Sequence, residues 1–202
     1  YESWSTIQQS KNDFPVDMDV IFQYLRDHLP ENAVITTDAG NFSGWAQRYL
    51  KYGRPGRLLA PTSGAMGYGL PSAISASLTK PDRLVVGLMG DGGFMMTGQE
   101  LATAAQQGAK PVIIVFNNGI YGTIRMHQAR DYPHRKIATD LFNPDFTKLA
   151  AAYGLKSVKV KKTADFPAAF KNAVESDTLT LIEVLNSPMQ ITTTKTMVDI
   201  EG

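Results

Sequence analysis

The sequence contains no cysteine, and its positive and negative charges are nearly balanced. The lack of cysteine excludes disulfides, thiolate zinc sites and cysteine-bound iron–sulfur clusters, and it fits a reducing compartment. With 20 Lys and Arg against 19 Asp and Glu, the chain has no overall field that would attract nucleic acid or anionic lipid. We therefore expect no nucleic-acid partner, and any anionic ligand must be bound by local groups.

Long apolar runs and a signal peptide are also missing. A membrane-spanning helix needs about 18 or more apolar residues in succession, so we expect no membrane partner and a cytoplasmic location. The 202 residues, 43% of them hydrophobic, suffice for one compact domain. Residues 1–14 begin without methionine, are mostly polar and lack periodicity, as is typical of the end of an interdomain linker.

Strand-like and helix-like segments alternate along the rest of the chain. Short runs rich in Val, Ile and Leu predict buried strands, and apolar residues three and four positions apart predict helices. We expect strands at 33–37, 57–60, 83–89, 111–116, 155–160 and 179–184, and helices at 18–29, 43–50, 68–80, 99–107, 146–153 and 166–174. The alternation predicts an α/β fold, a three-layer doubly wound and mainly parallel sheet of about six strands, in one domain over 15–186.

Three further segments have their own local signals. Thr97 to Glu100 fits a capping box, in which side chains satisfy free amides at a helix start, so we expect the helix to begin after the preceding glycines. Residues 118–140 have weak periodicity and read as a long connection, which is usually functional or mobile. The polar tail, residues 187–202, could fold over a site as a lid or hang free.

Polar side chains follow two of the predicted strands at the point where each strand ends. Asp91 lies within the run Gly90 to Gly93 after one strand, and Asn118 follows the next strand. In a parallel sheet the carboxyl ends of neighbouring strands lie side by side, and ligands bind just beyond them. Mg²⁺ prefers oxygen ligands and often sits between a carboxylate and ligand phosphates. The sequence therefore predicts a site for a cation together with a phosphate ester.

The spacing of these residues resembles the signature of thiamine-diphosphate-dependent enzymes. Residues 90–92, Gly-Asp-Gly, are followed by 24 residues and then by Asn117-Asn118, as in the domain that holds the diphosphate of the cofactor. The stretch 64–71, and its distance of 25 residues from Met66 to Asp91, resemble the acetolactate synthase and pyruvate oxidase branch. The resemblance extends over most of the chain, from the predicted helix at residue 18 to the last predicted strand.

This resemblance implies thiamine diphosphate and Mg²⁺ as cofactors. The implied metal ligands are Asp91, the Asn118 side chain and the backbone carbonyl of Ile120. Met66 would lie under the thiazolium ring and hold the cofactor in a bent form. The implied cofactor-binding residues are Asp38, Ala39, Gly40, Asn41, Phe42, Gly64, Ala65, Met66, Gly90, Asp91, Gly92, Gly93, Phe94, Asn118, Ile120, Tyr121 and Gly122.

The resemblance also implies a lyase or transferase that acts on a 2-oxo acid by decarboxylation, carboligation or both. The activating glutamate of such enzymes comes from a pyrimidine-binding domain, normally across a subunit interface, and no segment here resembles that domain. We therefore expect a homodimer or homotetramer, and no activity from this domain alone. The missing domain would belong to the same polypeptide or to a partner subunit.

Substrate residues are less clearly marked. Arg125 is a candidate for binding a substrate carboxylate, and His127 for proton transfer, because an unperturbed histidine titrates near pH 6.5. Acetohydroxyacid synthases have Gln-His where this chain has Asn41-Phe42, and Trp where it has His127. These departures imply a relative whose donor or acceptor differs.

Two other interpretations stay open. A cofactor subunit of a 2-oxo acid ferredoxin oxidoreductase shares the metal motif, although such subunits commonly carry cysteines. A non-catalytic relative would use the same fold as a binding module. A dinucleotide site would need the spacing G-x-G-x-x-G and an acidic residue about 20 residues later, which Gly90, Gly92 and Gly93 do not fit.

Overall fold

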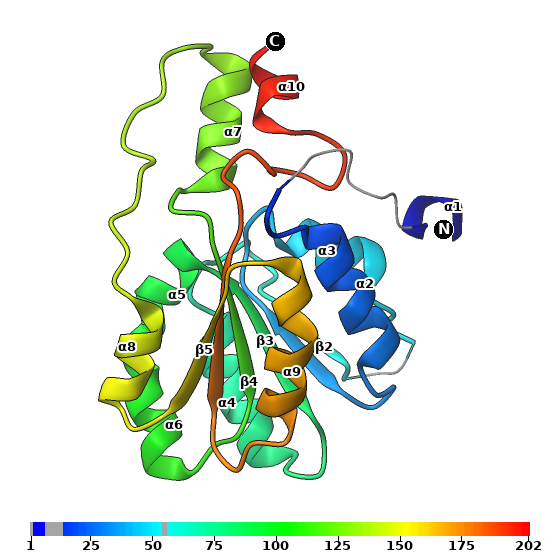
Figure 1. Ribbon diagram of the computed structural model, residues 1–202, viewed down its shortest axis with the longest axis vertical. Helices are drawn as coiled ribbons and strands as arrows, with labels where there is room; N and C mark the ends of the chain where they lie inside the picture. The colour runs from blue at the N-terminus through cyan, green and yellow to red at the C-terminus, as the bar shows by residue number, and fades with distance from the viewer. Residues whose placement is uncertain (1, 7–13, 54–55) are drawn as a thin grey trace.

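The computed structural model describes residues 2–6, 14–53 and 56–202, without the side chains of residues 2 and 3. In this part of the chain six strands form one sheet in the order β2-β1-β3-β4-β6-β5 (Figure 1). The strands are β1 (Val34–Thr37), β2 (Leu58–Leu59), β3 (Val85–Gly90), β4 (Val112–Asn117), β5 (Lys156–Val160) and β6 (Thr180–Leu185). Every adjacent pair is parallel, which confirms the predicted fold class.

Helices cover both faces of the sheet (Figure 1). One face carries α2 (Met18–His28), α3 (Ser43–Tyr49) and α9 (Phe166–Val174), and the other carries α4 (Gly69–Thr79), α5 (Asp91–Thr97), α6 (Leu101–Gln107) and α8 (Phe146–Ala152). Single 3₁₀ turns, η1 (Gly98–Glu100) and η2 (Thr163–Asp165), precede α6 and α9. Beyond the sheet, α7 (Gly122–Asp131) packs against α10 (Met197–Glu201), and α1 (Glu2–Ser5) contacts α3.

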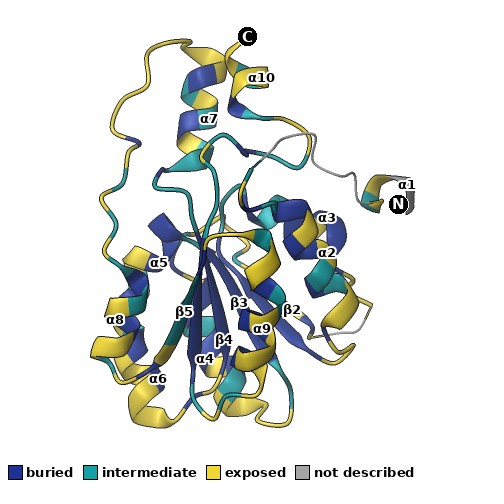
Figure 2. Ribbon diagram, in the orientation of Figure 1, coloured by how far each residue is buried: buried dark blue, intermediate teal, exposed yellow. Residues whose placement is uncertain are grey.

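The central strands are apolar throughout because both of their faces are covered. In β4, Ile114 and Phe116 pack into the layer of α2, α3 and α9, whereas Ile113 and Val115 pack into the layer of α4, α5, α6 and α8. Figure 2 shows the sheet buried between helices whose outer faces are exposed. This alternation explains why β4 has no polar face in the sequence.

The structure corrects the predicted helix start after the glycines. A separate helix, α5, begins at Asp91, so Gly92 and Gly93 form its first turn, and the predicted helix at 99–107 corresponds to η1 and α6. Thr97 makes no capping bond, and its hydroxyl instead donates to the carbonyl of Gly67 at 3.0 Å. The capping-box prediction is therefore wrong, because the threonine is used in a tertiary contact.

The structure also corrects the prediction for residues 118–140. Residues 122–131 form α7, whose only buried residues are Arg125 and Ala129. A helix that buries so little apolar surface has no regular apolar face, and periodicity could not reveal it. α7 lies beyond the carboxyl ends of the strands together with α10 (Figure 1).

The C-terminal tail is folded against α7. Ile191 and Met197 are buried, 1% and 3% exposed, in a small cluster that also contains Ile120. A capping box between Thr196 and Asp199 starts α10. The tail therefore stands over the strand ends, and its role as a lid stays a prediction.

The predicted linker falls partly outside the described residues, which omit 1 and 7–13. Within the part that is described, Arg48 of α3 donates to the carbonyl of Trp4 at 2.8 Å and to the hydroxyl of Thr193 at 3.0 Å. This buried arginine joins α1 to the C-terminal tail. In the described ranges, no helix combines the length and apolar character that crossing a bilayer requires.

Candidate cofactor site

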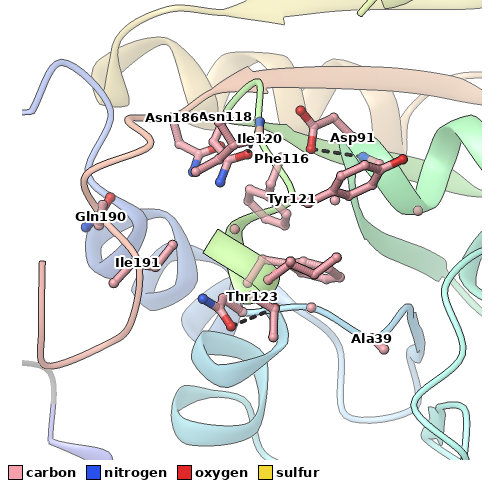
Figure 3. Close-up of a pocket in the computed structure, with 18 of the residues that line it drawn as sticks. Ala39, Asp91, Phe116, Asn118, Ile120, Tyr121, Thr123, Asn186, Gln190 and Ile191 are labelled. Atoms are coloured by element: carbon pink, nitrogen blue, oxygen red, sulfur yellow. Dashed lines mark hydrogen bonds between the residues drawn. The ribbon is translucent and has the colours of Figure 1, made fainter. Parts of the chain in front are cut away.

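A cleft lies at the carboxyl ends of β1, β3, β4 and β6 (Figure 3). β2 and β3 lie on opposite sides of β1, and ligands of parallel α/β folds bind where the strand order reverses in this way. The cleft encloses about 620 Å³ of empty space, part of it open to solvent. Its lining consists of Met18, Ala39, Gly40, Asn41, Phe42, Trp45, Met66, Gly90, Asp91, Gly92, Gly93, Phe116, Asn118, Ile120, Tyr121, Gly122, Thr123, Ile124, Asn186, Gln190 and Ile191.

Asp91 is the one carboxylate among these lining residues. It is 3% exposed, and its Oδ1 accepts from the amide of Gly92 at 2.9 Å. Its Oδ2 accepts from the amide of Gly119 at 2.9 Å and from the Asn143 side chain at 2.7 Å. Burial raises the pKa of Asp91 above its ordinary value, while the hydrogen bonds from Asn143, Gly119 and Gly92 act in the opposite direction. A bound cation would favour the ionised form further.

The floor of the cleft is bare backbone at two glycines. A Cβ atom on Gly92 would lie 2.6 Å from Cε1 of Tyr121, and one on Gly93 would lie 2.2 Å from Oδ2 of Asp38. Both distances are shorter than van der Waals contact, so an added methyl group would force Tyr121 or Asp38 to move. The bare backbone can then come close to a ligand.

The loop after β4 presents a second oxygen-bearing side chain to the cleft. Asn118 lines it next to Ile120, and Oδ1 of Asn118 accepts from the Ile120 amide at 3.1 Å (Figure 3). This Asx turn fixes the loop, and Gly119 within it has a φ of 71°. In the described residues, no group of three or more His, Asp or Glu could hold a metal. A cation here would therefore depend on one carboxylate, amide and carbonyl oxygens, and oxygens of a ligand.

The opposite wall comes from the loop after β1 and from Met66. Asn41 accepts a hydrogen bond from the hydroxyl of Thr123 at 2.8 Å, which ties this loop to α7. The ring of Phe42 stacks on Phe116 at the end of β4, with centroids 5.7 Å apart. Met66 is partly buried and lines the cleft between these walls.

Thirteen of the predicted cofactor-binding residues line the cleft, and four lie elsewhere. Asp38 is 1% exposed behind the lining and accepts from the Gly69 amide at 2.5 Å. Phe94 is in the core, edge-on to Phe146 with centroids 5.2 Å apart. Gly64 and Ala65 are exposed residues of the loop that carries Met66.

The two predicted substrate residues do not line the cleft either. Arg125 is 8% exposed and donates to Thr139 Oγ1 at 2.8 Å and to Asp140 Oδ1 at 2.7 Å. His127 is exposed on α7. The structure thus gives Arg125 a role in holding the chain after α7, and catalytic roles for both residues stay predictions.

Sequence reasoning missed several residues that distant segments bring to the cleft. Asn186 follows β6 directly, and its buried Oδ1 has no hydrogen-bond partner in the described structure. Gln190 is 7% exposed and accepts from the Met18 amide at 3.4 Å. The strand-end position of Asn186 is a signal that could have found it, since Asn118 was found in the same way. Gln190 and Ile191 lie in the tail and have no such signal.

Comparison with known proteins agrees with this geometry. The family model described as thiamine pyrophosphate enzyme, C-terminal TPP binding domain, matches residues 38–184. The chain is 38% identical over 154 residues to the mitochondrial acetolactate synthase catalytic subunit of Saccharomyces cerevisiae, which covers 76% of this chain and 22% of that protein. It is 33% identical over 167 residues to the acetolactate synthase isozyme 2 large subunit of Escherichia coli, which covers 82% of this chain and 30% of that protein.

A solved structure is similar over most of the chain. It is the thiamine diphosphate-dependent 4-hydroxybenzoylformate decarboxylase of Rhodococcus jostii RHA1, with a TM-score of 0.83 and 32% identity, covering 90% of this chain and 35% of that one. The chain spans less than a third of the length of the two curated relatives, 22% and 30%. The family match, the cleft at the strand ends and the Gly-Asp-Gly and Asn-Asn pair place this chain among the C-terminal thiamine-pyrophosphate-binding domains of thiamine pyrophosphate enzymes.

Proposed function

We propose that this chain holds the diphosphate of thiamine diphosphate together with Mg²⁺, as one part of an enzyme that acts on a 2-oxo acid. The observation that carries the proposal is the convergence of Asp91 and Asn118 in a cleft whose floor is bare backbone at Gly92 and Gly93. When bound, the cofactor supplies an electron sink for cleavage next to a carbonyl group. The protein supplies binding, orientation and electrostatics.

The donor atoms present in the cleft fit this pair of cofactors. Asp91, the Asn118 side chain and the backbone carbonyl of Ile120 provide hard oxygen ligands of the kind that Mg²⁺ prefers. The chain offers a cation one carboxylate there, so an anionic diphosphate would complete both the coordination and the charge balance. The backbone at Gly92 and Gly93 can approach that diphosphate because no side chain intervenes.

Met66 is held in place before any ligand arrives. The amide of Ala39 donates to the carbonyl of Ala65 at 3.3 Å, and Thr97 donates to the carbonyl of Gly67. Asp38 accepts from the amide of Gly69 on the other side of the loop. A wall fixed from three sides can support the central ring of a bent cofactor without reorganising, which is the role we propose for Met66.

The remaining chemistry is proposed for the larger protein. The relatives that the chain resembles are acetolactate synthases and a decarboxylase, and these names support decarboxylation of a 2-oxo acid, carboligation or both. The activating glutamate would come from a pyrimidine-binding domain outside these 202 residues, across the interface of a homodimer or homotetramer. Arg125 and His127 remain candidates for contact with the substrate.

Titration calorimetry with thiamine diphosphate on the full-length protein tests the proposal. We expect binding that requires Mg²⁺ and is lost in the Asp91→Ala variant. Asp177→Ala is the matched control, because that carboxylate is 83% exposed and pairs only with Lys156 among the described contacts. Binding that ignores Mg²⁺, or that survives Asp91→Ala unchanged, would overturn the proposal. A panel of 2-oxo acids with CO₂ detection then separates decarboxylation from ligation.

A further inference from the structure

Asn143 lies in the chain between α7 and α8, and its side chain reaches the carboxylate of Asp91. Its Nδ2 donates to Asp91 Oδ2 at 2.7 Å and to Asn117 Oδ1 at 2.9 Å. Both hydrogens of the Asn143 amide are therefore used. Asn143 does not line the cleft, so its contact with the site is through Asp91.

The orientation of these amides follows from the carboxylates at each end of the chain of bonds. An ionised carboxylate only accepts hydrogen bonds, so the nitrogen of Asn143 must face Asp91. Asn117 then presents its oxygen to Asn143, and its Nδ2 donates to Oε1 of Glu183 at 2.8 Å. A reversed Asn143 would place oxygen against oxygen. Asn143 therefore donates on both sides, to Asp91 and to Asn117, and Asn117 donates onward to Glu183.

The far end of this chain of bonds is anchored in the fold. Glu183 is 1% exposed on β6, and its Oε2 lies 3.0 Å from Nζ of Lys159 on β5. Lys159 also pairs with Asp145 at 3.2 Å. Asp145 caps α8 by accepting from the amides of Thr147 and Lys148. The position of Asn143 is thus set by two strands and a helix.

These bonds make the two oxygens of Asp91 unequal. Oδ2 accepts two hydrogen bonds, from Gly119 and Asn143, whereas Oδ1 accepts one, from Gly92. Since a carboxylate oxygen has two lone pairs in its plane, Oδ2 is saturated and Oδ1 keeps one free. We infer that Asn143 is a positioning residue of the metal site, which holds the Asp91 carboxylate so that Oδ1 is the oxygen left for the cation.

The inference rests on the proposed function and adds a consequence for metal selectivity. Mg²⁺ demands nearly octahedral geometry, whereas Ca²⁺ accepts flexible and more numerous oxygen ligands. Loss of a residue that orients a metal ligand typically lowers metal affinity about 10- to 100-fold. If the Asp91 carboxylate is free to rotate, the affinity for Mg²⁺ should therefore fall more than the affinity for Ca²⁺.

The test compares Asn143→Leu and Asn143→Ala in the full-length protein. Leucine keeps most of the volume of asparagine and removes both hydrogen bonds. Mg²⁺ and Ca²⁺ are titrated separately by calorimetry at saturating thiamine diphosphate. We expect about a tenfold or greater loss of Mg²⁺ affinity in both variants, and a smaller loss for Ca²⁺. The control is Asp177→Ala, which removes an exposed carboxylate paired with Lys156 and should leave the ratio of the two affinities unchanged.

Each outcome decides the inference. An unchanged ratio of Mg²⁺ to Ca²⁺ affinity in a folded Asn143 variant overturns it, as does the same fall in that ratio in Asp177→Ala. If both Asn143 variants lose the wild-type circular dichroism spectrum, the residue is structural and the inference is also overturned. Wild-type protein that binds no cofactor with Mg²⁺ would refute the proposed function itself, which separates the two failures.

Discussion

Gly93 rests directly on the carboxyl group of Asp38, where a Cβ atom would lie 2.2 Å from Oδ2. Asp38 is 1% exposed and its Oδ1 is bonded to the amide of Gly69. The end of β1, the start of α4 and the first turn of α5 therefore meet at one buried acid. Burial raises the pKa of Asp38, against hydrogen bonds from the backbone of residues 67–69.

Gly93→Ala should destabilise the protein by about 1–3 kcal/mol, because an added methyl group must displace a buried carboxyl that is already bonded. Gly92→Ala is the matched variant one residue earlier. Its methyl group would meet the Tyr121 ring, which is only partly buried and can move. We expect a smaller fall in melting temperature for Gly92→Ala, measured by differential scanning calorimetry. Equal losses in the two variants would contradict this account of the Asp38 contact.

Met66→Ala should lower turnover more than it lowers cofactor affinity. The diphosphate and metal contacts remain, but the cofactor's central ring loses its support, and misplaced reacting groups commonly cost tenfold or more in rate, on the order of 10–100-fold. Steady-state kinetics with a 2-oxo acid, together with calorimetry, measure the two effects. Met95→Ala is the control, because Met95 is 47% exposed and does not line the cleft. A parallel loss of turnover and affinity in Met66→Ala would count against the proposed role.

Asp19→Asn should stabilise the protein relative to wild type as the pH rises. Asp19 is 6% exposed and accepts from Trp45 Nε1 at 3.1 Å and from the hydroxyl of Tyr49 at 2.7 Å. Burial raises the pKa of Asp19 despite these bonds. A raised pKa in the folded state means that the fold favours the protonated carboxyl of Asp19. The stability that this carboxyl contributes is fully present below the unfolded pKa of about 3.9, and it is lost as the pH rises through the folded pKa.

The measurement is the melting temperature of wild type and Asp19→Asn between about pH 4 and pH 7. Asparagine keeps an acceptor oxygen for Trp45 and Tyr49 but cannot ionise. The difference between the two proteins should therefore move in favour of the variant with increasing pH. Asp27→Asn, an exposed carboxylate on the same helix, is the control. A difference that stays constant, or that moves in favour of wild type, would show that burial of Asp19 is not the dominant cause.

Met197→Ala should loosen the C-terminal tail without weakening the sheet. Met197 belongs to the cluster with Ile120 and Ile191, which is separate from the two large clusters on the sheet. Removing a buried methionine side chain lowers the free energy of unfolding by about 2–5 kcal/mol. Here the lost contacts are those that hold α10 against α7. We expect faster amide hydrogen exchange in residues 186–202 and unchanged exchange in β4. Val198→Ala, at a position 63% exposed, should change neither.

Much of the fold was predictable from local patterns. The strands β3, β4 and β6 are buried on both faces, so their apolar runs were plain in the sequence. The helices α2 and α9 each present one apolar face to the sheet and were recognised by spacing. By contrast, α7 packs mainly against the tail and has no regular apolar face, so its sequence did not predict a helix. Thr97 contacts Gly67 across the fold, so the capping-box pattern at Thr97 was misleading.

The sequence by itself determined the alternation of strands and helices and the spacing of Asp91, Asn117 and Asn118, because these depend on residues close together in the chain. The tertiary structure decided what surrounds them. Asn143 lies 52 residues after Asp91, and Asn186 and Ile191 line the cleft from the segment that follows β6. No local periodicity encodes such contacts, since they form only when the sheet brings its strand ends together and the tail folds over them.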